Sequence, residues 1–277
     1  MKIKLRDYQQ KAVNFAKKVN RCLFCMRVGS GKTICAMFAL RAFFKEKLID
    51  KAVIACTKSS VPVFVEDFKE KANIDVPVIE DENDFVEFFK GNDKVCVIKH
   101  SMFKKAGNDL MTIKRLEKIY DKGVKVALVI DEAHKMQNPE GIEHDAFMHI
   151  EEMFSRVILM TATPYSSCLS QFYGLIHLIY PKLWKSKREF FDNYIDEIII
   201  RDPKTHRPVR KEKISYKNLK EFRSKIEPFT YFYYPAIPLR HVEHKCTLSK
   251  EHYEEYLNLC WGCIDSETQN KIEKLRN

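Results

Sequence analysis

The chain has 277 residues, of which 45% are hydrophobic and 31% are charged, and its formal net charge is +10. This composition fits a globular protein that buries a core. No apolar run reaches the ~18 residues of a membrane helix, and no apolar stretch follows the basic N-terminal residues as it would in a secretion signal. We therefore expect an intracellular protein, in the cytoplasm or nucleus, with no membrane partner.

The cysteine content and the distribution of charge further narrow the class of protein. The nine cysteines are odd in number and scattered along the chain, which fits reduced thiols better than a disulfide framework. Residues 182–225 hold fourteen Lys or Arg and seven acids. This basic excess favours a phosphate-rich partner such as nucleic acid, although a solvated lysine-rich surface would give the same count.

Strand and helix patterns alternate through the first 165 residues. The expected strands are mostly continuous Val, Ile, Leu and Cys runs, typical of strands that are covered on both faces. They fall at residues 22–26, 52–56, 94–99, 126–130 and 156–160, with a weaker one at 76–79. Helical patterns begin at residue 5 and recur at 33–47, 61–71, 101–120 and 140–154. This alternation predicts a parallel α/β sheet wound on both sides.

The pattern changes after residue 165. Helices are expected at residues 171–180, 188–195 and 218–226. Between the last two, the charged stretch 198–215 predicts a hairpin or a mobile loop. Residues 231–246 are aromatic and then extended, and the final thirty or so residues read as a polar helix.

A phosphate-binding loop is predicted where a strand, a glycine-rich turn and a helix follow one another. The turn is Met26-Arg27-Val28-Gly29-Ser30-Gly31-Lys32-Thr33. Its two glycines let the backbone approach an anion, and the helix points its free N–H groups and positive dipole end at the same place. We expect Lys32 to reach the β- and γ-phosphates of ATP and Thr33 to bind magnesium. A glycine-rich turn with a solvated lysine is the simpler alternative, and the full pattern has Gly where Met26 stands.

A pair of acids ends the strand expected at residues 126–130, within the sequence Asp131-Glu132-Ala133-His134. Two carboxylates at a sheet edge near a phosphate loop can divide the work of ATP hydrolysis. We assign Asp131 to the magnesium ion, and Glu132 to orienting or deprotonating the attacking water. A strand that merely ends in a polar turn is the alternative, but the upstream loop makes it much less favoured, because paired motifs are more specific than single ones.

Two hydroxyl residues end the next strand, in Thr161-Ala162-Thr163-Pro164. Such hydroxyls can link a nucleotide site to a moving partner surface, or simply cap a turn before proline. We expect Thr161 and Thr163, together with His134, to couple the nucleotide site to the partner surface.

In this order, the motifs GSGKT, DEAH and TATP resemble the first motor domain of a superfamily-two helicase. Finer matches, over roughly residues 5–255, are similar to the Swi/Snf-type DNA-dependent ATPases. They are Leu5-Arg6-Asp7-Tyr8-Gln9 and a run from Thr163-Pro164 through Tyr173-Gly174-Leu175-Ile176 to Tyr180-Pro181, followed by Phe190 and Phe191. The resemblance implies an α/β fold, with a RecA-like doubly wound parallel sheet of the P-loop NTPase type and a mainly helical C-terminal extension.

The same resemblance implies ligands and contacts. ATP and magnesium are the expected cofactors, and Gln9 is the expected adenine contact. The nucleotide-binding set is then Gln9, Gly29, Ser30, Gly31, Lys32 and Thr33. Strand-end residues would contact the nucleic-acid backbone, namely Thr57, Lys58, Ser59, Ser60, Lys99 and His100. The pattern after Pro164 favours DNA over RNA.

The chain departs from the family pattern at three places. Ala162 stands where the family commonly has Gly, Ser166 and Ser167 stand where it has a Gln-Asn pair, and residues 231–234 read Tyr-Phe-Tyr-Tyr where a basic Arg-Arg segment is usual. These departures leave the predicted ATP site intact. The expected organisation is a RecA-like core at residues 1–165 and an extension of the same lobe at 166–277.

A second RecA-like lobe, which such motors use to supply an arginine finger, is expected to be absent from these residues. Past Gly174 the sequence has one glycine, Gly262, and Cys263 follows it where the family has a Gly-Arg step. A finger of this class contributes roughly 10³-fold or more to turnover. We therefore expect the chain alone to bind ATP, to hydrolyse it poorly, and to need a partner chain or a second lobe.

Two other functions stay open at this point. One is half of an RNA helicase, since DEAH also occurs there, and the other is a non-catalytic module that binds nucleotide and docks to a partner. The second is disfavoured because a pure scaffold would not need Lys32, Thr33, Asp131 and Glu132 together.

Several cysteines and histidines could bind a metal in principle. Cys22 and Cys25 lie three apart in a strand, so they face opposite sides and are expected in the core. His144 and His149 are expected to be surface or satisfied core residues. A zinc site is conceivable near the C-terminus, although the spacing is not that of a standard finger; its residues would be His241, His244, Cys246, Cys260 and Cys263.

Overall fold

The computed structural model describes residues 4–102, 123–164, 169–201, 208–235 and 249. The described residues up to Pro235 belong to one compact unit, Met1–Pro235. Most of the helix expected at 101–120, the expected C-terminal helix and the cysteines from 246 onward lie outside the described residues. Within the described residues, no helix is long and apolar enough to cross a membrane.

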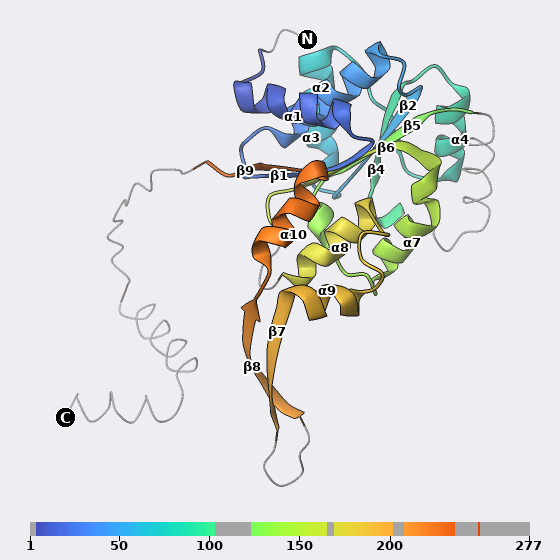
Figure 1. Ribbon diagram of the computed structural model, residues 1–277. Helices are drawn as coiled ribbons and strands as arrows, with labels where there is room; N and C mark the ends of the chain where they lie inside the picture. Colours follow the sequence, from blue (N-terminus) through green and yellow to red (C-terminus); the bar gives the residue numbers. More distant parts are fainter. Residues whose placement is uncertain (1–3, 103–122, 165–168, 202–207, 236–248, 250–277) are drawn as a thin grey trace. The chain divides into compact units, whose positions relative to one another are not determined.

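A seven-stranded sheet organises this unit, in the order β3-β4-β2-β5-β6-β1-β9 (Figure 1). Every pairing in it is parallel. Its strands are β1 (Arg21–Met26), β2 (Lys51–Cys56), β3 (Val78–Ile79), β4 (Val95–Lys99), β5 (Val126–Ile130), β6 (Phe154–Thr161) and β9 (Thr230–Tyr233). The expected parallel α/β sheet is confirmed, and each expected strand is present. The sequence does not predict β9 as a member of this sheet.

Alternate residues of β1 show how the sheet is wound on both sides. Cys22, Phe24 and Met26 are buried under one helical layer, whereas Leu23 and Cys25 are buried under the other. Side chains of a strand alternate between its two faces, so an unbroken apolar run requires cover on both. The two cysteines are core residues, as expected, and burial raises the pKa of both thiols.

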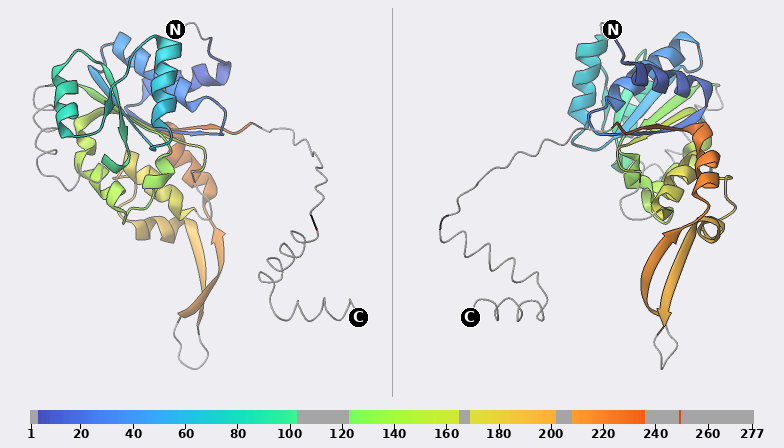
Figure 2. Two further views of the ribbon diagram at one scale, coloured as in Figure 1. Left: turned by 180° about the vertical axis from the view of Figure 1, so that it is seen from behind. Right: turned by 60° about the vertical axis from the view of Figure 1, so that its left-hand side comes forward.

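The helices divide between these two faces (Figures 1 and 2). The first layer contains α1 (Asp7–Lys18), α2 (Lys32–Lys45) and α3 (Val61–Ala72). The second layer contains α4 (Glu82–Lys90), α7 (Ile142–Ile150), α8 (Ser170–Ile179), α9 (Lys187–Tyr194) and α10 (Leu219–Ile226). Because α8, α9 and α10 share one core with β5 and β6, that core continues past residue 165. The division into domains at that residue stays a prediction.

Short elements complete the second layer. They are the 3-10 helices η1 (Ala133–Met136), η2 (Glu151–Met153) and η3 (Glu227–Phe229). The helix expected at 140–154 is too long, because α7 ends at Ile150 and Phe154 already pairs with Val126 in the sheet. Within the charged stretch, residues 198–201 and 208–215 belong to an antiparallel hairpin of β7 (Ile195–Arg201) and β8 (Pro208–Tyr216), which projects from α9 and α10 (Figure 2).

Candidate nucleotide-binding site

Three neighbouring strands carry the three predicted motifs to one edge of the sheet. In the sheet order, β5 lies beside β6 and β6 lies beside β1. The phosphate loop follows β1, Asp131 follows β5, and Thr161 is the last residue of β6. The carboxyl ends of parallel strands meet at one edge, which is where open α/β sheets bind their ligands. Sequence order alone does not reveal that β1 and β6 are neighbours.

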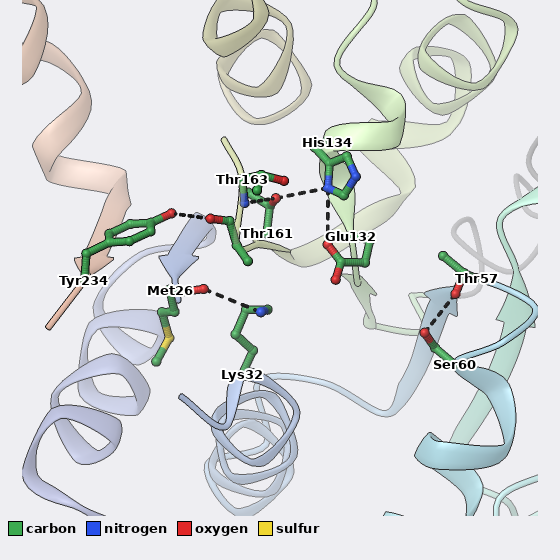
Figure 3. Close-up of polar contacts among 10 residues, drawn as sticks. Met26, Lys32, Thr57, Ser60, Glu132, His134, Thr161, Thr163 and Tyr234 are labelled. Atoms are coloured by element: carbon green, nitrogen blue, oxygen red, sulfur yellow. Dashed lines mark hydrogen bonds and ion pairs between the residues drawn. The ribbon is translucent and has the colours of Figure 1, made fainter. Parts of the chain in front are cut away.

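The phosphate loop has the backbone conformation that its glycines allow. Gly29 and Gly31 have φ angles of 75° and 80°, in the left-handed region that favours glycine. A Cβ at Gly31 would lie 2.5 Å from Nε2 of Gln9, so any larger residue there would collide with that side chain. The Lys32 ammonium donates to the Met26 carbonyl at 3.5 Å, a weak bond that a phosphate can replace (Figure 3).

Gln9 is buried against this loop and uses half of its hydrogen-bonding capacity. Its Nε2 donates to the Ser30 carbonyl at 3.1 Å, and its Oε1 accepts from the Arg6 amide at 3.0 Å. A side-chain amide has two N–H donors and two lone pairs on its oxygen. One donor and one lone pair are therefore left for a ligand. The adenine contact of Gln9 stays a prediction.

The acid pair lies within electrostatic reach of Lys32. Burial raises the pKa of the Asp131 carboxyl to about 6, the neighbouring Glu132 adds to this rise, and the Lys32 ammonium opposes it. Glu132 has a φ of 49°, a left-handed conformation that costs a non-glycine residue roughly 1–2 kcal/mol. This backbone turn leads from β5 directly into η1.

His134 gathers the coupling residues around Glu132. Its Nδ1 lies 3.2 Å from Oε2 of Glu132 and 3.2 Å from Oγ1 of Thr161 (Figure 3). That same Thr161 hydroxyl accepts from the Thr163 amide at 3.1 Å. The geometry thus brings the predicted coupling residues together beside a carboxylate, while their coupling role stays a prediction.

Three predicted nucleic-acid contacts form a hydroxyl cluster after β2. Oγ1 of Thr57 lies 2.8 Å from Oγ of Ser60 (Figure 3). It also lies 3.0 Å from Oγ of Ser59. Lys58 is exposed beside them. The cluster precedes α3, so hydroxyls and helix N–H groups lie at the same place, as phosphate binding requires.

The other two predicted contacts lie at the end of the neighbouring strand β4, Lys99 as its last residue and His100 directly after it, and both have partners within the protein. Lys99 forms an ion pair with Glu80, and the His100 amide donates to the Cys56 carbonyl at 2.9 Å. Burial lowers the pKa of the His100 imidazole, which favours the neutral ring. All six predicted nucleic-acid contacts stay predictions.

Sequence reasoning missed a histidine pair that anchors η1. Nδ1 of His144 lies 2.8 Å from the Met136 carbonyl, and its Nε2 lies 2.9 Å from Nδ1 of His177. The carbonyl requires a proton on Nδ1 of His144, so Nε2 accepts from His177. The pair ties η1, which follows the acid pair, to α7 and α8. The sequence signal for this pair is the presence of two histidines on apolar helical faces, but only the fold shows that the two side chains meet.

This pair predicts a loss of stability in mild acid. Burial lowers the pKa of the His144 imidazole from 6.5 to about 4, so the unfolded chain binds the extra proton first. Stability is then complete above pH 6.5 and falls as the pH drops, by about 3 kcal/mol at pH 4. Urea unfolding from pH 7.5 to 4.5 should show a shallower fall in His144→Asn, whose amide can still donate to Met136. Parallel profiles for the two proteins would contradict the assignment.

Among the described residues, no group of three or more His, Cys, Asp or Glu side chains is arranged so that it could hold a metal ion. As expected, His144 is a satisfied core residue, and His149 is exposed with its Nδ1 2.8 Å from the Asp145 carbonyl. The possible zinc ligands from His241 to Cys263 lie outside the described residues.

Comparisons with known proteins agree with this geometry. The family described as "Type III restriction enzyme, res subunit" matches residues 2–166, which is more than half of the chain. The chain is 30% identical over 69 residues to Protein CHROMATIN REMODELING 5 of Arabidopsis thaliana, covering 25% of this chain and 4% of that protein. It is 25% identical over 184 residues to the uncharacterized ATP-dependent helicase YqhH of Bacillus subtilis (strain 168), covering 66% of this chain and 30% of that one.

Solved structures extend the likeness of fold beyond the family match. The Sulfolobus solfataricus SWI2/SNF2 ATPase core in complex with dsDNA superimposes with a TM-score of 0.63 at 18% identity, covering 84% of this chain and 45% of that one. A second solved structure, the Sulfolobus solfataricus SWI2/SNF2 ATPase core domain, gives a TM-score of 0.61 at 17% identity, covering 83% of this chain and 43% of that one. The chain thus spans less than half the length of these relatives. It belongs to the family described as the type III restriction enzyme res subunit, and it has the fold of the first, ATP-binding motor domain of a Swi2/Snf2-type superfamily-two helicase.

Proposed function

We propose that these residues form the ATP-binding half of a nucleic-acid-dependent ATPase of the helicase or translocase type. The observation that carries the proposal is the convergence of the phosphate loop, the acid pair and the hydroxyl pair on three adjacent strand ends. Lys32 acts on the pKa of Asp131, and His134 links Glu132 to Thr161. A nucleotide site that also has to respond to a partner surface needs these groups together.

The side chains divide the reaction between binding and proton transfer. Lys32 leaves the Met26 carbonyl and binds the β- and γ-phosphates, while the backbone N–H groups of Gly29 and Gly31 cradle them. Glu132 orients the attacking water and accepts its proton, and His134 holds that carboxylate in place. Gln9 reads adenine with its remaining donor and lone pair, which match the N7 acceptor and N6 donor of that base.

Magnesium fits the oxygen donors at this site. Asp131 would hold the ion together with the hydroxyl of Thr33, since magnesium prefers hard oxygen ligands. Burial and Glu132 raise the pKa of Asp131, and a bound cation restores its charged form. When bound, magnesium neutralises charge that develops on the phosphates.

DNA is the proposed track. The hydroxyl cluster after β2 and the exposed Lys58 supply a surface chemistry suited to a phosphate backbone, and the basic composition of residues 182–225 favours the same kind of partner. One solved relative of the same fold is in complex with dsDNA. RNA is the second candidate, since the DEAH sequence occurs in RNA motors as well.

Turnover is expected to need a second lobe, whether from further chain or from a partner protein. The test measures ATP hydrolysis by the chain alone and with a candidate second lobe, each with double-stranded DNA, single-stranded DNA or RNA. We expect low turnover alone and roughly 10³-fold higher turnover when the second lobe and double-stranded DNA are both present. Fast hydrolysis by the chain alone would contradict the requirement, and preferential stimulation by RNA would overturn the choice of DNA.

A further inference from the structure

Residues 231–234, here called the tyrosine strap, run beside the strand that feeds the phosphate loop. The pairing of β9 with β1 continues as far as Tyr233 opposite Met26. The Arg27 amide then donates to the Tyr233 carbonyl at 3.0 Å, and the Arg27 guanidinium donates to the Pro235 carbonyl at 3.3 Å. The strap therefore ends against the first residues of the loop.

One arm of the strap reaches the phosphate loop through Tyr8. The Tyr8 and Tyr233 rings stack with centroids 3.8 Å apart and planes 8° apart, and the Tyr231 hydroxyl donates to the Tyr8 carbonyl at 2.7 Å. The Tyr8 hydroxyl in turn donates to the Ser30 carbonyl at 3.1 Å. Glycines flank Ser30 on both sides and give the loop a backbone with many accessible conformations. Contacts from outside the loop therefore help to select the one that binds anions.

The second arm reaches the acid side of the site through Tyr234. Its hydroxyl donates to the Ala162 carbonyl at 2.8 Å (Figure 3). Ala162 directly follows Thr161, whose hydroxyl meets His134, and His134 meets Glu132. The strap thus touches both walls of the candidate site, the loop on one side and the hydroxyl turn on the other.

We propose that the tyrosine strap is a positioning element with two separable effects, an inference that rests on the proposed function. Tyr233 acts through Tyr8 to hold the Ser30 peptide in the ATP-binding conformation. Tyr234 acts through Ala162 to hold Thr161, and with it His134 and Glu132, in the hydrolytic arrangement. The first effect belongs to ATP affinity and the second to kcat, because different walls of the site are held.

The arm that acts through Tyr233 and Tyr8, here called the affinity arm, is tested by titrating the full chain with MgATP. We expect Tyr233→Leu to bind about tenfold more weakly, since an aromatic pair is lost, whereas Tyr233→Phe keeps the ring and binds like wild type. Tyr8→Phe keeps the stack, loses the bond to Ser30, and is expected to bind about threefold more weakly. Tyr180→Phe is the matched control, because Tyr180 is exposed and stacks on Phe229 near Arg21, at the start of β1.

The arm that acts through Tyr234 and Ala162, here called the turnover arm, is tested in the assembled motor, which is the chain together with its second lobe. We expect Tyr234→Phe to lower kcat about fivefold and to leave the KM for ATP unchanged, since it removes one neutral hydrogen bond away from the phosphates. An unchanged kcat, or a loss confined to KM, would overturn this arm. Thermal unfolding of each variant establishes that it is folded, and Tyr8→Phe decides the affinity arm if Tyr233→Leu does not fold.

The two proposals fail in different ways. A wild-type chain that does not bind MgATP removes the proposed function itself. A wild-type chain that binds, together with Tyr233→Leu and Tyr8→Phe variants that bind equally well, overturns the affinity arm of the strap and leaves the proposed function standing.

Discussion

Replacing Glu132 by Gln is expected to leave ATP binding intact and to lower turnover of the assembled motor by roughly 10²–10⁴-fold. The amide has the length of the carboxylate and can still accept from His134, whose Nδ1 lies 3.2 Å from Oε2 of Glu132. It cannot take a proton from the attacking water. The measurement is steady-state ATP hydrolysis with the second lobe and DNA present, alongside titration of the variant with MgATP.

The matched control changes an acid that lies outside the site. Glu140 is exposed and forms an ion pair with Lys187 at 2.9 Å, which lowers the pKa of its carboxyl. Glu140→Gln should therefore keep wild-type turnover. Undiminished hydrolysis by Glu132→Gln would show that another group activates the water. Hydrolysis that is absent from the wild-type assembly as well would favour the non-catalytic module.

Gly174→Ala is expected to destabilise the fold by about 3 kcal/mol. A Cβ at this position would lie 1.6 Å from the Gln137 carbonyl oxygen and 2.5 Å from its carbon, so α8 and the backbone after η1 cannot both keep their places. Alanine favours the helix by only about 1 kcal/mol relative to glycine, which is too little to offset this overlap. Thermal unfolding should shift downward by roughly 6–12 °C.

Gly91→Ala is the control, because it makes the same substitution without the overlap that Gly174→Ala creates. Gly91 follows α4 with a φ of −80°, and a Cβ there would lie 3.1 Å from the nearest atom, the Glu87 carbonyl oxygen. Its unfolding free energy should change by less than about 1 kcal/mol. If Gly174→Ala is as stable as wild type, the helix propensity of alanine outweighs the overlap. In that case α8 packs less closely against the backbone after η1 than the structure indicates.

Much of the fold can be predicted from local sequence. Apolar runs such as residues 126–130 identify buried strands, because both faces must be covered, and glycines 29 and 31 identify a turn with positive φ. Local sequence does not predict the helix α4 or the place of β9 in the sheet. The α4 sequence has many acids and is short. The partner of β9 is β1, some 200 residues earlier, and a single sequence has no local signal for such a pairing.

The candidate site, like the fold, can be predicted from the sequence only in part. The sequence indicates which residues follow strand ends, so Lys32, Asp131 and Thr161 could be proposed together. It does not indicate which strands are neighbours or which helices meet, so the contact of His144 with His177 and that of Tyr234 with Ala162 required the structure. Gly174 did have a signal, since a glycine inside a strong helical pattern often marks a close approach of backbone.

The most direct test of the account measures MgATP affinity of the full chain and of two variants, Lys32→Ala and Asp131→Asn. Each variant removes a charged partner of the ligand, so we expect binding at least about tenfold weaker, and Asp131→Asn should lose most of its dependence on magnesium. Lys187→Ala, which changes an exposed lysine paired with Glu140, should bind like wild type. Folded Lys32→Ala and Asp131→Asn proteins that bind MgATP as tightly as wild type would contradict the account.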